Sequence, residues 1–128
     1  MSDYLPASVA IARAAGDVLM RHFGTVGSQT KGGLDLGAEA ALAAERLTVR
    51  QLREQFPAHG VVAEESTTAT ATDPEAFTWY VDPLDGTGNF SRGDPHFAVS
   101  LGLVRQEQPV LGVVYNPARD EIFTCLLY

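Results

Sequence analysis

The sequence predicts an α+β protein, a layered sandwich in which two N-terminal helices pack on a mostly antiparallel sheet. Up to Pro57, apolar residues recur at helical spacing, and after it they form short runs typical of strands. The last runs are joined by connections short enough for hairpins. A chain of 128 residues that is 45% hydrophobic can form one core. We therefore expect a single domain over residues 1–128.

The first helix is expected to be capped by Ser2 or Asp3 and to extend to about Phe23, with Pro6 in its first turn. Its core-facing positions are Val9, Ala12, Gly16, Leu19 and Phe23. Residues 24–33 are predicted to form a glycine-rich loop. This loop is either a plain linker or a lid in which Lys31 contacts an anion.

A second, alanine-rich helix is predicted from Ala38 to about Phe56, where Pro57 ends it. Five strands follow, with a polar loop over residues 66–76 between the first two. The predicted strands are Val61–Glu64, Phe77–Val81, Phe97–Arg105, Val110–Tyr115 and Ile122–Tyr128. Trp79 and Phe90 are expected in the core, and the single cysteine, Cys125, is expected to be a buried thiol.

The run DPLDGTGNF, from Asp82 to Phe90, gathers carboxylates and a hydroxyl at one glycine-containing turn. Asp82 closes one apolar run, Asp85 lies across the turn, and Glu64 closes another apolar run. Two carboxylates about 4 Å apart repel by about 4 kcal/mol at an effective dielectric of about 20. If the two strands are neighbours, protonation or a divalent cation must relieve this repulsion. Mg²⁺ suits a site that has only oxygen ligands.

The second half of the run is suited to an anion. Glycines let backbone N–H groups approach an oxyanion, and a helix that begins at Gly86 or Thr87 would offer its first amides to a phosphate. The Thr87 hydroxyl could then orient a water that attacks phosphorus, with Glu64 as the acceptor of the water's proton. The chemistry predicted is hydrolysis of a phosphate monoester.

An ordinary loop remains an alternative for the same residues. Asp-Pro and Asp-Gly are typical of turns, and acidic pairs such as Glu64-Glu65 usually lie in solvent. The combination favours function, because acids end two separate apolar runs and a glycine and hydroxyl turn follows.

Four segments together resemble the inositol monophosphatase family, a group of Mg²⁺-dependent, lithium-sensitive phosphomonoesterases. They are VVAEES (61–66), WYVDPLDGTGNF (79–90), GDPHFAVS (93–100) and PVLGVVYNP (109–117). The resemblance covers nearly all of this chain but only the N-terminal half of the family's length. It implies a layered sandwich fold from which the C-terminal half is missing.

The resemblance also implies a metal site. Glu64, Asp82 and the backbone carbonyl of Leu84 would hold a first Mg²⁺, for which Mn²⁺ could substitute, while Asp82 and Asp85 would reach a second cation. Gly86 and Thr87 would donate amides to the phosphate, and Thr87 would help to activate the water. The catalytic residues are thus Glu64, Asp82 and Thr87.

Two features depart from the family's pattern. Where similar proteins have Asp-Leu-Val-Thr-x-x-Asp, this chain has alanines, Ala38 and Ala41, in place of the threonine and the second aspartate. Glu39 is displaced by two residues, which turns a helical side chain by about 200°. The chain also ends within an apolar strand, before the family's metal-binding aspartate in a Trp-Asp motif. We expect one nearly intact metal site and a weakened second one.

Composition limits the partners. The net charge of −7 argues against nucleic acid and against anionic membranes. No targeting signal or membrane-length apolar run is visible, so we expect a cytoplasmic protein. An unpaired apolar strand at Ile122–Tyr128 predicts a homo-oligomer, or pairing through that edge.

The predicted function is a Mg²⁺-dependent phosphomonoesterase that hydrolyses small polyol or sugar phosphates, most readily inositol monophosphate. The alternative is a catalytically impaired remnant that binds metal or pairs with another subunit. Cofactor and substrate are therefore Mg²⁺ and a small phosphorylated molecule.

Overall fold

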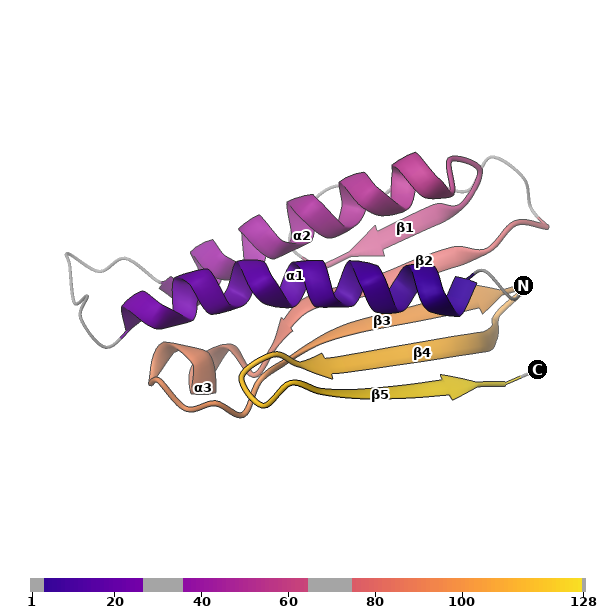
Figure 1. The fold of residues 1–128 in the computed structure, drawn as a ribbon. Coiled ribbons are helices and arrows are strands. Elements are labelled where there is room, and N and C mark those ends of the chain that lie inside the picture. Colours follow the sequence, from indigo (N-terminus) through magenta and orange to yellow (C-terminus); the bar gives the residue numbers. More distant parts are fainter. Residues whose placement is uncertain (1–3, 27–35, 65–74, 128) are drawn as a thin grey trace.

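A computed structural model describes residues 4–26, 36–64 and 75–127 (Figure 1). The chain folds into two long helices, five strands and one short helix. In order they are α1 (Tyr4–Val26), α2 (Leu36–Gln55), β1 (Gly60–Ala63), β2 (Thr78–Asp85), α3 (Thr87–Ser91), β3 (Ala98–Arg105), β4 (Gln108–Asn116) and β5 (Glu121–Leu126). None of the helices in the described ranges is long and apolar enough to cross a bilayer.

The strands form one sheet in sequence order, β1-β2-β3-β4-β5. β1 and β2 are parallel, and every other neighbouring pair is antiparallel. Both long helices lie on one face of this sheet, where α2 packs over β1 and β2, and α1 over β3 and β4 (Figure 1). The predicted α+β sandwich of two helices on a mostly antiparallel sheet is confirmed.

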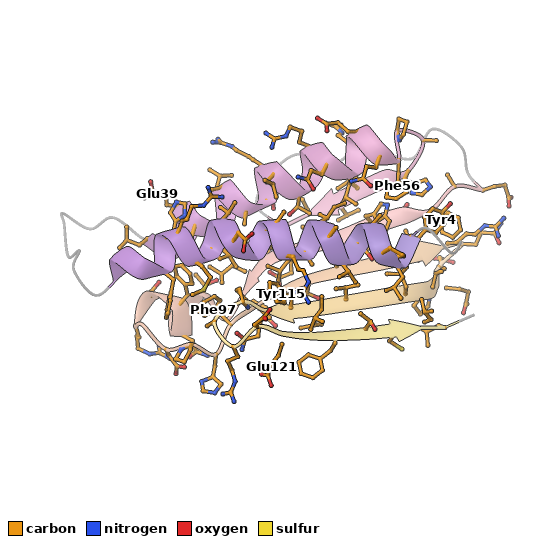
Figure 2. The ribbon with its side chains drawn as sticks, in the orientation of Figure 1. Tyr4, Glu39, Phe56, Phe97, Tyr115 and Glu121 are labelled. Atoms are coloured by element: carbon orange, nitrogen blue, oxygen red, sulfur yellow. The ribbon has the colours of Figure 1, made fainter. Side chains whose placement is uncertain are left out.

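Close packing between α1 and the sheet depends on small residues. A Cβ added at Gly16 would lie 2.5 Å from Cε2 of Tyr115, so only glycine fits against this ring. Figure 2 shows Tyr115 beneath α1. Trp79 and Phe90 are fully buried, as predicted, as are Ala12 and Leu19 of α1.

Aromatic side chains close the core at the end where α1 begins and α2 ends. The Tyr4 and Phe56 rings, labelled in Figure 2, meet edge to face with centroids 5.4 Å apart. His59 stacks on Phe56, and its Nδ1 accepts a hydrogen bond of 3.0 Å from the Trp79 indole N–H. Burial lowers the pKa of His59, so the neutral ring that this bond requires is favoured.

Element ends differ from the sequence-based expectations by at most four residues. The largest difference is β2, which was expected to end at Val81 but continues through Asp85. α1 extends to Val26, whereas its expected cap at Ser2 or Asp3 lies outside the described residues. The lid and Lys31 lie outside them as well, as does most of the predicted polar loop.

The face of the sheet away from the helices is bare in the described structure. Across β4 and β5, Val113 pairs with Thr124 on the helix side, so the next pairs, Val114 with Phe123 and Gly112 with Cys125, lie on the other side. Phe123 is 60% exposed and Val114 is 40% exposed. The expectation of a buried Cys125 was wrong, because Cys125 lies on this bare face and is exposed.

Candidate active site

Parallel pairing of β1 with β2 brings the first two acidic residues together. The last paired residues are Ala63 and Val81, so the next residues, Glu64 and Asp82, are neighbours where β1 ends. The Glu64 carboxyl lies close enough to that of Asp82 to act on it both as a hydrogen-bond partner and as a charge. Asp82 is half-buried and Glu64 is exposed, so the pair is open to solvent on the Glu64 side.

A bulge in β2 brings Asp85 to the same face. Asp82 pairs with Ser100 and Asp85 pairs with Ala98, so three steps along β2 match two along β3. In a regular strand, residues three apart point to opposite faces, but the additional residue restores the parity. Pro83 is tolerated here because a bulge frees the chain from one ladder hydrogen bond. Asp82 and Asp85 therefore both lie on the face away from the helices.

The electrostatics of Asp82 show the effect of this crowding. Its pKa is raised from 3.8 to about 6, first by burial, then by the hydrogen bond and charge of Glu64, and then by the charge of Asp85. The backbone N–H of Leu84 donates to Asp82 Oδ1 at 3.3 Å and acts in the opposite direction. As a result, the Asp82 carboxyl retains its proton up to unusually high pH.

The turn after β2 has the backbone conformation that the sequence suggested. Gly86 has φ 93° and ψ 40°, and the helix α3 begins at the next residue. A Cβ at Gly86 would approach the backbone oxygen of His96 to 2.9 Å, so both the left-handed conformation and the space require glycine. The first amides of a helix have no partner within it, so those of α3 can bind an oxyanion.

Thr87 connects this turn to the acidic pair. Its hydroxyl donates a hydrogen bond of 3.3 Å to the carbonyl oxygen of Leu84. A carbonyl oxygen has a second lone pair, so this bond leaves Leu84 able to bind a cation. The donated proton also leaves the Thr87 oxygen free to accept a hydrogen bond from water.

Two adjacent cavities lie on this face. The first, of about 350 Å³, is lined by Glu64, Asp82, Tyr80, Ser100 and Gly102 among others. The second, of about 370 Å³, includes Asp85, Gly86, Asn89, His96 and Phe123. Both volumes are in the range of small-molecule sites.

Ser100, Tyr80 and His96 were not identified as site residues from the sequence. Strand alternation alone could have placed Tyr80 on the face of Asp82. Ser100 required the register of β3 against β2, which the sequence does not fix.

The donor set is suited to a hard dication. It consists of carboxylates, a backbone carbonyl and a hydroxyl, and the pKa of Asp82 is raised by burial and then by Glu64 and Asp85, whose charges a cation would neutralise. Within residues 4–26, 36–64 and 75–127, however, no three His, Cys, Asp or Glu side chains converge closely enough to form a metal cluster. Glu64 interacts directly with Asp82, and Asp85 acts on Asp82 through charge.

The helix α2 adds no acid to this site in the described structure. Ala41 is buried at 2% exposure in the core, where a carboxylate would have no place without a partner. Glu39 lies in the first turn of α2 and is exposed (Figure 2).

The sequence of this chain is similar to those of known proteins. The sequence model of the inositol monophosphatase family matches residues 1–127. This chain belongs to the inositol monophosphatase family. Inositol monophosphatase 2 from Solanum lycopersicum is 39% identical over 130 residues, which cover 98% of this chain and 49% of the tomato protein. Inositol-1-monophosphatase from Rhizobium meliloti is 44% identical over 113 residues, or 86% of this chain and 42% of that protein.

Solved structures of the inositol monophosphatase family have the same fold. The extragenic suppressor protein suhB from Bartonella henselae superposes with a TM-score of 0.83 at 38% identity, covering 95% of this chain and 48% of that one. Inositol monophosphatase from Anabaena gives 0.82 at 34% identity, with 98% and 44% covered. The chain thus spans about half the length of the relatives it matches.

Proposed function

We propose that this chain provides the metal and phosphate site of a Mg²⁺-dependent phosphomonoesterase. The observation that supports the proposal most directly is the Glu64 and Asp82 pair, in which burial first, and then the hydrogen bond and charge of Glu64, raise the pKa of Asp82 to about 6 beside a glycine turn. A pair of acids with a purely structural role would not stabilise the fold in this arrangement, since the arrangement destabilises the ionised form of Asp82. A cation bound between the two carboxylates makes the charge favourable.

In the proposed site, Glu64, Asp82 and the Leu84 carbonyl hold Mg²⁺, or Mn²⁺ in its place, and Asp85 contributes to a second cation. When bound, the metal lowers the pKa of water and neutralises phosphoryl charge. The remaining steps belong to the chain's own groups. The amides of Gly86 and Thr87 bind the phosphoryl oxygens, and the Thr87 oxygen accepts a hydrogen bond that orients the water.

The water oxygen attacks phosphorus as the bond from phosphorus to the ester oxygen breaks. Glu64 is the proposed proton acceptor, since it is the exposed member of the pair and lies beside the half-buried Asp82. The ester oxygen takes a proton from solvent and leaves as the alcohol, Glu64 returns its proton to solvent, and inorganic phosphate remains. The substrate we propose is a small polyol or sugar phosphate, with inositol monophosphate first, because relatives that match most of this chain are named inositol monophosphatases.

The direct test is phosphate release from inositol 1-phosphate by the purified chain with Mg²⁺, Mn²⁺ or EDTA. We expect turnover that requires a divalent cation and is lost in EDTA. The Thr87→Val variant should lose about 100-fold in kcat, because a methyl group cannot orient water. Equal rates with cation and with EDTA would contradict the proposal, and so would a Thr87→Val variant as fast as the unchanged protein.

The alternative is a metal-binding or subunit-binding module without turnover, which the alanine at position 41 and the exposed strand β5 favour. Either function fits an acidic protein without nucleic-acid or membrane partners, and we propose a cytoplasmic location.

The exposed edge at β5 predicts association. Its residues Glu121–Leu126 pair only with β4 in the described structure, so one edge of the strand is open to a second copy of the chain. We expect sedimentation to show a dimer or larger species at micromolar concentration. Replacing Thr124, in mid-strand, by Pro removes the backbone donor and should reduce association. A stable monomer at all concentrations would rule out pairing through this edge.

A further inference from the structure

His59 lies between the end of α2 and the start of β1, where its ring contacts side chains from three parts of the chain. It stacks on Phe56 with ring centroids 5.0 Å apart and meets Tyr4, in the first turn of α1, edge to face at 5.4 Å. Phe77, just before β2, packs on it at 5.4 Å, and the Trp79 indole N–H donates to its Nδ1. We call these five residues the His59 cluster, which joins α1, α2 and β2 at one end of the domain.

The bond from Trp79 is compatible with only one charge state of the imidazole. Nδ1 accepts it, so the neutral ring carries its proton on Nε2, whereas both nitrogens of the charged ring are donors. Protonation of His59 therefore removes the acceptor. Trp79 is fully buried, and among the described residues His59 is the only acceptor for its indole N–H. The charged state thus leaves a buried donor without a partner, which is costly.

The surroundings of the ring are mainly aromatic. Tyr4 is the titratable side chain that contacts it. Charged side chains on the surrounding elements are Arg53 and Glu54 in the last turn of α2, and Arg105 and Glu75 beside Phe77. Arg105 and Glu75 pair with each other at 3.6 Å. Burial is the cause that lowers the pKa of His59 from its ordinary value of 6.5, so a proton on His59 is unfavourable while the cluster is closed.

β1 begins directly after His59 and is held by few contacts. It is a four-residue strand at the edge of the sheet, with β2 as its single neighbour among the described strands. Its first amide, that of Gly60, donates to the Phe77 carbonyl at 2.9 Å, so this bond adjoins the cluster. Short elements at an edge open more readily than the centre of a sheet. Glu64 follows the last residue of β1, so an opening of β1 also reaches the candidate active site.

We propose that His59 is a pH-sensitive switch, in which protonation of the imidazole breaks the bond from Trp79 and opens β1 and the first turn of α1 while the rest of the sheet stays folded. The opened state binds the proton more tightly than the closed state, because the pKa of His59 is lowered only while its ring is buried. The closed state is therefore fully favoured above about pH 6.5 and weakens as the pH falls below that value. The switch does not depend on the proposed reaction.

The test needs a local probe, because the proton on Asp82 stabilises the fold at low pH and so has the opposite effect. Trp79 is the only tryptophan of the chain, so its indole N–H gives a single resonance. Hydrogen exchange is measured between about pH 7.5 and 5, and each rate is divided by the intrinsic rate at that pH to give a protection factor. We expect the protection of the Trp79 indole N–H and of the Gly60 amide to fall by about tenfold. The protection of amides in the middle of β3 and β4 should not fall.

Two variants separate the switch from a general effect of acid. His59→Asn keeps an acceptor, since its amide oxygen can take the position of Nδ1, but it does not titrate, so protection should no longer fall with pH. His59→Phe keeps an aromatic ring without the acceptor and should show low protection already at about pH 7.5. His96→Asn changes an exposed histidine outside the cluster and is the control that should behave as the unchanged protein does.

Equal protection of the Trp79 indole N–H at both ends of this pH range would overturn the proposal. So would a loss of protection that all amides share, or a His59→Asn variant that retains the pH dependence of the unchanged protein. The His59 ring should itself titrate below pH 6.5, and a midpoint at or above that value would also contradict the switch. The titration of the unchanged protein decides the question even if neither variant folds.

Discussion

Replacing Asp82 by Asn is expected to lower the affinity for Mg²⁺ by about 100-fold and to reduce metal-dependent phosphate release at least as much. Asp82 is the half-buried member of the acidic pair and is placed by the bulge to act with both Glu64 and Asp85. Its loss therefore removes the carboxylate shared by the proposed cation sites. Calorimetric titration measures the affinity, and Asp17→Asn on the exposed side of α1 is a matched control that should change nothing.

The same substitution should stabilise the metal-free protein. The pKa of Asp82 in the folded state, about 6, lies above its ordinary value of 3.8, so the folded protein binds this proton more tightly. The stabilisation from that proton is present below about pH 4 and is lost as the pH rises through about 6. At about pH 7.5 the ionised Asp82 opposes folding, and after allowance for its solvent exposure Asn should add about 1 kcal/mol.

The affinity for Mg²⁺ should depend on the ionisation of Asp82. Below about pH 6 the cation competes with a proton on Asp82, so Mg²⁺ binding should weaken by up to tenfold per pH unit. A variant at position 82 that binds Mg²⁺ as the unchanged protein does, or an affinity that is flat between about pH 5 and 7, would show that Asp82 is not a ligand.

Replacing Gly86 by Ala is expected to destabilise the fold by about 2 to 4 kcal/mol. The residue has φ 93°, and its new Cβ would lie 2.9 Å from a backbone oxygen and 3.3 Å from Phe97. Phe97 cannot retreat easily, because its ring packs on those of Phe23 and Phe90. Thermal and urea unfolding measure the loss.

Gly88→Ala is the matched control for this experiment. It lies in the same short helix, and its added Cβ meets only the end of the flexible Arg92 side chain, at 3.3 Å. Alanine is also the better helix former, so stability should change by less than about 1 kcal/mol. Equal effects at positions 86 and 88 would mean that the turn does not need its left-handed residue.

Pattern in the sequence predicted the helices, the strands and the layering, because apolar spacing reports which side of an element is buried. It also placed Glu64 and Asp82 at the ends of two apolar runs, but the parallel pairing of β1 with β2 is what shows that these ends are neighbours. The sequence pattern did not predict the bulge at Pro83. Asp-Pro is compatible with a turn, and only the pairing of β2 with β3 shows that the strand continues. The prediction that Cys125 is buried was wrong, because an apolar run in the sequence does not reveal that the strand lies at an uncovered edge of the sheet.

The sheet separates the residues that stabilise the fold from those of the candidate active site. In the part of the chain that the structure describes, most of the hydrophobic core lies between the helices and one side of the strands, whereas the acids, the glycine turn and His96 belong to the opposite side or its rim. Ions and small esters can therefore bind and dissociate without any opening of the packed core. Thermal robustness and turnover should consequently respond to different sets of substitutions.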